Sequence, residues 1–162
     1  MKKVIFITTV LFTITTAFAQ QSVSKNALGV RFGSNDGFGA EISYQHKLSS
    51  ENRLEFDLGF RNSNDYAAFK LAGLYQWVWN IDKGFNWYAG VGAGLGSWSY
   101  DKNKNKESGA FVFGAGDIGI EYNFDIPLQI SLDFRPELYL NSGAYRNSNF
   151  GSDIGLGLRY KF

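Results

Sequence analysis

Apolar and polar residues alternate with a period of two in eight separate stretches of this 162-residue chain. In a β-strand, successive side chains point to opposite faces, so each stretch predicts a strand with one apolar and one polar face. We find no helical period of useful length and no linker. The sequence therefore predicts one all-β domain. The eight stretches are 28–33, 38–45, 54–61, 69–80, 85–96, 111–124, 128–135 and 153–162.

The sixth stretch changes parity part of the way along. Phe111 and Phe113 take one parity, whereas Ile118 and Ile120 take the other. If all four side chains face the same side of the sheet, one extra residue must shift the register between them. We therefore expect a β-bulge at 114–116.

The first 19 residues are typical of a secretory signal peptide. Lys2 and Lys3 precede an apolar run over 4–14, and Ala17-Phe18-Ala19 matches an A-x-A cleavage site. Threonines at 8, 9, 13, 15 and 16 make this segment too short for a transmembrane helix, which needs roughly 20 apolar residues. We expect cleavage after residue 19, a short periplasmic segment over 20–26 and a β-domain over 27–162.

Composition excludes several classes of protein. Lys and Arg number 16 against 15 for Asp and Glu, so charge gives no reason to expect a nucleic-acid partner. The chain has no cysteine, which excludes disulfides, a Cys-ligated zinc site and a thiol nucleophile. We expect no cofactor and no metal.

The alternation fits two kinds of barrel, a soluble lipocalin-like one with an apolar interior and a membrane barrel with an apolar exterior. Glycine is abundant, at 19 residues, and much of it falls on the polar face. Glycine weakens a solvent-facing strand, but in the narrow lumen of an eight-stranded barrel it leaves room for large neighbours such as Tyr88. This favours the membrane barrel.

Aromatic residues gather at one predicted rim. If both termini are periplasmic, the ends of the even strands and the starts of the odd strands meet there, and aromatic rings are expected at the level of the lipid headgroups. This predicted girdle comprises Tyr44, Phe56, Trp77, Trp79, Phe85, Trp87, Tyr122, Phe124, Tyr160 and Phe162.

The turns at this rim are short, at 49–52, 82–84 and 125–127, and polar loops at 101–108 and 141–149 are longer. Asn35-Asp36-Gly37 is typical of a hairpin turn at the same end as the longer loops. Short periplasmic turns and longer outside loops are usual in outer-membrane barrels. Eight strands of about 10 residues fit the chain, whereas sixteen would not, so a large porin is excluded. We predict an eight-stranded antiparallel up-and-down transmembrane β-barrel.

The sequence resembles the small eight-stranded outer-membrane barrels of the OmpX and OmpA-membrane-domain type. Residues 155–162 resemble the assembly signal of that family, in which alternating apolar residues close on a terminal Phe. The resemblance implies that Tyr160 and Phe162 are read by the outer-membrane insertion machinery during assembly. It also implies a Gram-negative outer membrane as the location. The outside loops are modest, which argues against an adhesive role through a protruding sheet.

Charged residues of both signs fall on the predicted inner face. Because a narrow lumen must pair its charges, we expect a network of ion pairs rather than paired carboxylates for acid and base catalysis. Counting from the turn at 125–127 places Asp117 opposite Arg135, with Asp133 and Glu137 beside it, which predicts an Arg135-centred cluster that plugs the lumen. The inward residues are Arg31, Glu41, Glu55, Asp57, Arg61, Lys70, Asp117, Glu121, Asp133, Arg135, Glu137, Asp153, Arg159 and Lys161.

His46 is the one residue that could anchor a catalytic triad, as in lipid-modifying enzymes of this membrane. It shares its face with Tyr44 and Leu48, opposite Ser43, and the sequence has no His-x-Ser pair. We interpret it as an interfacial residue, so no catalytic residue is expected. The predicted function is a non-enzymatic barrel with a structural or surface-interaction role. The alternatives are a narrow pore for ions or small solutes and a lipid-modifying enzyme.

The expected partners are outer-membrane lipid and lipopolysaccharide, besides the insertion machinery, and a monomer is expected. Lysines 102, 104 and 106 lie in the predicted loop 101–108 and could contact lipopolysaccharide phosphates. Solvation of that loop is the simpler interpretation.

Overall fold

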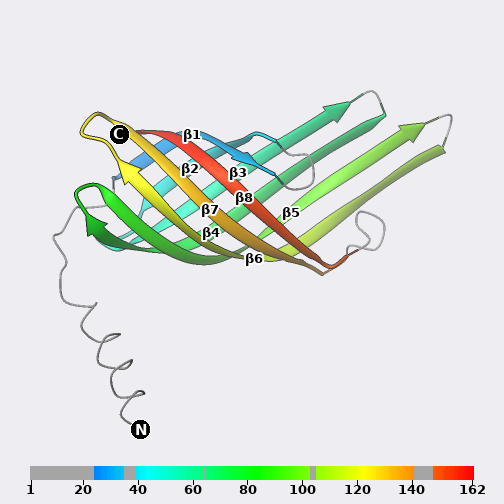
Figure 1. Ribbon diagram of the computed structural model, residues 1–162. Coiled ribbons are helices and arrows are strands. Elements are labelled where there is room, and N and C mark those ends of the chain that lie inside the picture. The colour runs from blue at the N-terminus through cyan, green and yellow to red at the C-terminus, as the bar shows by residue number, and fades with distance from the viewer. Residues whose placement is uncertain (1–23, 35–38, 64, 103–104, 141–147) are drawn as a thin grey trace, which may run out of the picture.

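A computed structural model of the protein describes residues 24–34, 39–63, 65–102, 105–140 and 148–162. The predicted signal peptide and the predicted turn at 35–37 lie outside the described residues. The predicted fold class is confirmed: eight antiparallel strands follow one another around a closed barrel (Figure 1). The strands are β1 (Asn26–Gly33), β2 (Glu41–Lys47), β3 (Asn52–Ser63), β4 (Tyr66–Asp82), β5 (Phe85–Lys102), β6 (Asn105–Asn123), β7 (Leu128–Tyr139) and β8 (Phe150–Lys161).

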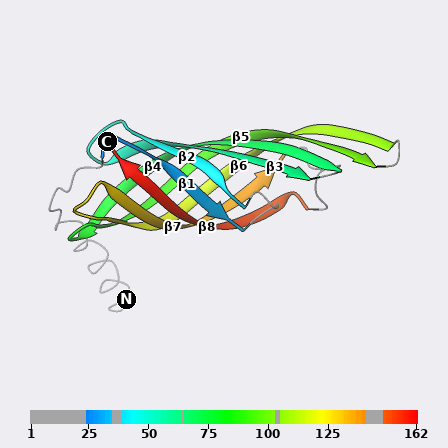
Figure 2. The same ribbon diagram turned by 90° about the horizontal axis from the view of Figure 1, so that it is seen from above.

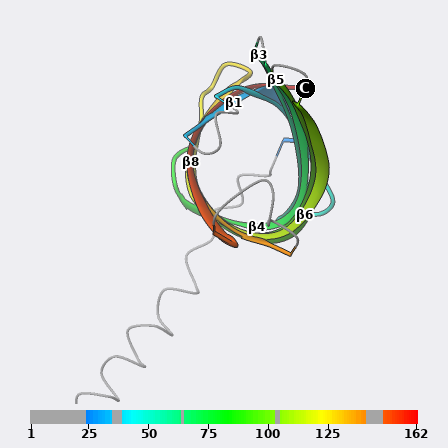
Figure 3. The same cartoon turned by 90° about the vertical axis from the view of Figure 1, so that its right-hand side faces the viewer.

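Pairing between the first and last strands closes the barrel. The β1–β8 ladder runs from Ala27↔Lys161 to Gly33↔Gly155. Figure 3, which looks along the barrel, shows the strands forming a complete ring. Among the described residues, none forms a helix that is long and apolar enough to cross a membrane.

Short turns join the strands at the end of the barrel that also holds the carboxyl terminus (Figure 1). In the turn between β4 and β5, Lys83 and Gly84 both have positive φ, at 29° and 94°. Two consecutive positive φ values are the mark of the tight hairpin turns that match the twist of the strands. A Cβ at Gly84 would also lie 2.7 Å from the carbonyl oxygen of Asn123, so glycine is required there for two reasons.

Strands β3 to β6 continue past the closed part of the barrel. The β2–β3 ladder ends at Glu41↔Gly59, whereas β3 continues to Ser63. The β5–β6 ladder likewise continues to Lys102↔Asn105, beyond the last described β6–β7 pair, Phe113↔Tyr139. Figures 1 and 2 show the two hairpins, β3–β4 and β5–β6, extending from one end. We call residues 60–63, 66–69, 97–102 and 105–110 the protruding sheet.

The protruding sheet corrects two expectations. Within 101–108, residues 101–102 and 105–108 are strand rather than loop, because Asp101↔Lys106 and Ser99↔Ser108 are strand pairs, and 103–104 lie outside the described residues. Polar side chains suggested a loop there, but a polar side chain is compatible with a strand whose two faces meet solvent. The modest loops also argued against a protruding sheet, and that prediction was wrong because these polar residues form strands.

The predicted bulge in β6 is also wrong. The β5–β6 register runs without a shift from Phe85↔Tyr122 to Lys102↔Asn105. Phe111 and Phe113 instead point into the barrel, where they are 0% and 1% exposed, while Val112 between them faces outward. The assumption that every apolar side chain faces outward caused the error.

Candidate functional site: a charged layer and an aromatic layer

The interior of the barrel is charged and its exterior is apolar. Among the described residues, buried acidic side chains outnumber buried basic ones, eight to five. The eight carboxylates belong to Glu41, Glu55, Asp57, Asp117, Glu121, Asp133, Glu137 and Asp153, and the five cations to Arg31, Arg53, Lys70, Arg135 and Arg159. Large exposed apolar side chains, such as Val91, Ile154 and Leu156, cover the outside.

Arg135 is fully buried and lies among carboxylates from the opposite wall of the barrel. Its Nη2 donates to Glu55 Oε1 at 3.0 Å and to Asp57 Oδ2 at 2.8 Å, and its Nη1 lies 3.9 Å from Glu41 Oε2. The predicted ion pairs with Asp117, Asp133 and Glu137 do not form in the described residues. Position along neighbouring strands predicted those partners, but the long guanidinium side chain reaches across the narrow lumen from β7 to β3.

Asp133 pairs with Arg31, and Glu137 pairs with Lys70. Arg31 binds Asp133 through Nε and Nη2, and its Nη1 donates to Asp153 at 2.7 Å and to Glu41 at 3.1 Å. Glu41 therefore lies between Arg31 and Arg135 and connects the two clusters.

Glu55 contacts two arginines and two glutamines in the interior. Besides Arg135, it lies 3.2 Å from Arg159 Nη2 and accepts a hydrogen bond from Gln45 Nε2 at 2.6 Å. Arg159 also donates to the hydroxyls of Ser43 and Ser131 at 2.9 and 2.8 Å. These contacts join β2, β3, β7 and β8 across the lumen.

Sequence reasoning missed Arg53, which is fully buried. Its Nη1 donates to Glu121 Oε2 and its Nε to Gln76 Oε1, both at 2.6 Å, and its guanidinium lies over the ring of Tyr88 at 4.8 Å. Arg53 has the same parity as Glu55, so extending that alternation two residues toward the turn could have found it.

Asp117 takes part differently from the other inward carboxylates. It accepts a hydrogen bond from Gln76 Nε2, which also donates to Glu55 at 3.3 Å. Asp117 Oδ1 is buried and has no hydrogen-bond partner among the described residues, nor does the hydroxyl of Tyr88. We call the buried charges from Arg31 to Arg159, apart from Lys70 and Glu137, the charged layer.

Lys70 and Glu137 connect the charged layer to a layer of rings. Lys70 Nζ donates to Glu137 Oε1 at 2.6 Å, and Tyr139 donates its hydroxyl hydrogen to Glu137 Oε2 at 2.7 Å. Lys70 Nζ also lies 4.9 Å from the centroid of the Phe113 ring.

We call Trp98, Phe111, Phe113 and Tyr139 the aromatic layer. These side chains are buried together with Ala72, Leu74 and Ala115. The centroid of Tyr139 lies 5.7 Å from that of Phe111 and 5.3 Å from that of Phe113. Phe113 and Phe111 follow Asp117 along β6 in the direction of the protruding sheet, so these rings lie on that side of the charges.

Glycines of β5 lie directly opposite these rings. Gly94 pairs with Phe113 and Gly96 with Phe111, and a Cβ at either glycine would overlap the facing ring. The same relation holds for Gly119, which faces Tyr88. The glycine-rich alternation over 85–96, together with the parity of Phe111 and Phe113, was the signal for the aromatic layer.

Two inward-parity cations lie outside these layers. Arg61 is exposed on the protruding sheet, with its guanidinium 4.8 Å from the Tyr66 centroid, so its predicted place in the lumen network is wrong. The network needs the closed part of the barrel, and β3 has already left it at Gly59. Lys161 lies near the opposite rim and donates to the carbonyl oxygen of Phe124 at 2.9 Å.

The residues of the predicted girdle pack against each other on the outer face near the short turns. Trp79 and Trp87 are a cross-strand pair with stacked rings 4.3 Å apart, and the rings of Phe85 and Tyr122 lie 4.5 Å apart. Phe124 meets Tyr122 edge to face at 4.7 Å.

The other members of the set are also on the outer face. Trp77 is 39% exposed and Phe56 is 42% exposed, with Phe56 packed over Gly73. Tyr160 and Phe162, the predicted assembly signal, are both more than half exposed, and their rings stack 6.4 Å apart.

His46 contacts an amide and a ring. Its Nδ1 lies 2.9 Å from Asn26 Oδ1, and its ring stacks on Tyr44 with the centroids 6.4 Å apart. Tyr44 donates its hydroxyl hydrogen to the same Asn26 oxygen at 2.9 Å. In the described part of the chain, no three ligating side chains gather in a way that could hold a metal ion.

A closed eight-stranded barrel with a charged interior and an apolar exterior has the fold of the small outer-membrane β-barrels of the OmpA and OmpX type. The N-terminal β-barrel domain of OprF from Pseudomonas aeruginosa shares this fold with a TM-score of 0.66 and 10% identity, over 86% of this chain and 100% of that one.

Two further solved structures have the same fold. Ail, the attachment invasion locus protein of Yersinia pestis, matches with a TM-score of 0.59 and 17% identity, over 86% of this chain and 97% of that one. Neisserial surface protein A matches with a TM-score of 0.58 and 13% identity, over 85% and 94% of the two chains. No family model and no curated protein sequence matches the chain. At identities this low, the likeness establishes a shared fold.

Proposed function

We propose that this protein is a non-enzymatic integral barrel of a Gram-negative outer membrane, with a structural or surface-interaction role and a lumen closed by ion pairs and rings. The proposal depends on one observation above all. Arg31, Arg53 and Arg135 are 0% exposed inside the barrel, whereas apolar side chains such as Val91 and Ile154 are more than half exposed outside it.

This distribution is the reverse of that in a soluble barrel. A protein in water buries apolar side chains and exposes charged ones, and large apolar patches on its surface are rare. A transmembrane barrel must present an apolar band to lipid and can keep its charges in the lumen. The likeness in fold to OprF, Ail and Neisserial surface protein A supports the same location.

The rings near the short turns support an orientation. Stacked pairs such as Trp79 with Trp87 suit the level of the lipid headgroups. With the turns and the carboxyl terminus at the periplasmic side, the protruding sheet extends outward from the cell. Tyr160 and Phe162 then end the strand that we propose the insertion machinery reads.

The contacts across the lumen support a closed barrel. Arg135 joins β7 to β3, Arg31 joins β1 to β7, and the aromatic layer lies between these charges and the protruding sheet. An interior filled by paired charges and rings leaves little space through which a solute could pass. The contacts of His46 with Asn26 and Tyr44 suit an interfacial residue rather than a catalytic base.

A narrow pore is the second candidate. Among the described residues, eight buried carboxylates outnumber five buried cations and Asp117 Oδ1 has no hydrogen-bond partner, which favours cations if any ion passes. Ions in such a pore would have to pass the aromatic layer, where Phe111 and Phe113 are buried.

Cell fractionation with a heat-dependent gel shift tests the location. The chain, expressed with its leader in a Gram-negative host, is expected in the outer-membrane fraction and should migrate at different positions in unheated and boiled samples. The matched control is a variant with charges on the outer face, Leu156→Arg with Ile154→Glu, which should lose both properties. Recovery of the unaltered chain as a soluble periplasmic protein would contradict the proposal.

A further inference from the structure

A trough of about 650 Å³ crosses the outer face of the protruding sheet. The strand register shows that its lining residues come from three adjacent rows across the four strands. Of the residues that line it, Arg61, Ala68, Trp98 and Gly109 form one row of inward parity across the four strands, and the others belong to the outward rows on either side. The inward side chains of the adjacent rows, such as Lys70, do not line it, so the trough lies on the outside of the sheet.

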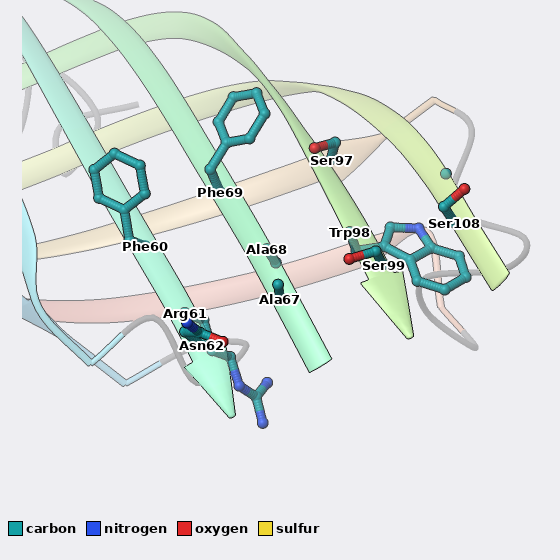
Figure 4. Close-up of a pocket in the computed structure, with 11 residues that line it drawn as sticks. Phe60, Arg61, Asn62, Ala67, Ala68, Phe69, Ser97, Trp98, Ser99 and Ser108 are labelled. Carbon is teal, nitrogen blue, oxygen red and sulfur yellow. The ribbon is translucent and has the colours of Figure 1, made fainter. Parts of the chain in front are cut away.

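One wall of the trough is aromatic. Phe60 pairs with Phe69 across β3 and β4, and Phe60 is 63% exposed. Figure 4 shows the two rings beside each other, on the side of the trough toward the barrel. The next residue of this row is Ser97, whose small side chain leaves the space beside the rings open.

The other wall is small and polar. It is formed by Asn62, Ala67, Ser99 and Ser108, which are consecutive partners across β3, β4, β5 and β6 and are all exposed. An amide and two hydroxyls can both donate and accept hydrogen bonds. A sugar ring has the complementary chemistry, because it presents an apolar C–H face to an aromatic ring and hydroxyls at its edge.

The rows on either side of the trough indicate what would surround a sugar bound there. Next to the aromatic wall, toward the barrel, lies the apolar outward row Leu58, Leu71, Leu95 and Val112. Beyond the polar wall, Asp101 and Lys106 form an ion pair at 3.1 Å. An occupant of the trough therefore has hydrocarbon on one side of its sugar and water on the other, as a glycolipid has.

We propose that this trough binds the sugar headgroup of a glycolipid of the outer leaflet, with its acyl chains on the leucine row. The inference rests on the proposed function, because it needs the protruding sheet to face outward from an outer membrane. Phe60 and Phe69 stack on the sugar, and Asn62, Ser99 and Ser108 bind its hydroxyls.

The absence of native cysteine makes a direct test possible. Ala67→Cys places one thiol in the trough at a residue that does not bind the sugar hydroxyls, and Ser152→Cys places one on exposed β8 as the matched control. Both full chains are reconstituted in phospholipid vesicles with increasing amounts of purified lipopolysaccharide, and the rate of maleimide labelling is measured. At about ten times the Kd, about a tenth of the sites stay open, so labelling of the Ala67→Cys protein should slow about tenfold.

Two further variants assign the effect to the trough. Phe60→Ala with Phe69→Ala, in the Ala67→Cys protein, should abolish the slowing, whereas Phe134→Ala on the outer face of β7 should leave it intact. Equal slowing at Ser152→Cys, or slowing by the delipidated polysaccharide alone, would overturn the proposal, as would no slowing at all. A chain that labels without slowing but still shows the heat-dependent gel shift overturns only this inference, and one that never enters the membrane overturns the proposed function.

Discussion

The charged layer and the aromatic layer are both buried inside the barrel, but they pack by different physical means. In the charged layer, each long side chain needs particular partners, as Arg135 needs Glu55 and Asp57 from the opposite wall. In the aromatic layer, Phe111 and Phe113 need volume, which Gly96 and Gly94 provide directly opposite. The first layer should therefore be sensitive to lost partners and the second to lost or added volume.

Loss of a central cation should have the largest effect. Arg135→Ala leaves Glu55 and Asp57 buried beside fewer cations, which should lower the free energy of unfolding by about 3–5 kcal/mol. Urea titration in lipid vesicles, followed by tryptophan fluorescence, measures it. Arg61→Ala, on the exposed protruding sheet, is the matched control and should cost no more than about 1 kcal/mol, because it removes only an exposed contact with the Tyr66 ring. Equal effects of the two variants would contradict the lumen network.

A cavity in the aromatic layer should have a slightly smaller effect. Phe113→Ala should cost about 3 kcal/mol, because it removes a buried ring. Gly94→Ala alone should also destabilise the barrel, because its Cβ would overlap the Phe113 ring and lie 2.6 Å from the carbonyl oxygen of Leu71. Gly94→Ala added to Phe113→Ala should cost less than the sum of the two single changes, because only the overlap with the ring is removed. Unfolding titrations of the three variants give the coupling, and additive effects would show that the two residues do not share the space.

Removal of a whole ion pair should have the smallest effect. Lys70→Met alone leaves Glu137 without its cation, at a cost of about 3 kcal/mol. Lys70→Met with Glu137→Gln should cost less than about 1 kcal/mol, because Gln still accepts from Tyr139 and Met packs on Phe113. A double variant as unstable as the single one would show that the layers are coupled through more than this pair.

Much of this architecture could be predicted from the period of two. It gives the strands and the face of most residues, because backbone geometry fixes side-chain direction. It cannot give partners across the lumen, and so Arg135 was assigned to Asp117, its neighbour along the sheet, rather than to Glu55. The period of two also shows which residues share a face without showing whether that face points inward. Phe111 and Phe113 predict a bulge only if apolar side chains must face outward, and in the structure both face the lumen.

Polar side chains in 101–108 also predicted the wrong local structure for the candidate site outside the barrel. Asp101 and Lys106 suggested a loop, yet they are strand partners joined by an ion pair. The trough depends on those extra strand residues, because its polar wall needs Ser99 and Ser108 to be opposite each other. Their sequence positions alone carry no such information.

Electrical recording tests the closed lumen most directly. The refolded full chain is inserted in planar lipid bilayers, with a large porin as positive control and protein-free membranes as negative control. If the charged and aromatic layers close the barrel, membranes holding the wild-type protein should show no steady openings. Steady single-channel openings of the wild-type protein would contradict the closed lumen, and a preference for cations would then identify it as the narrow pore.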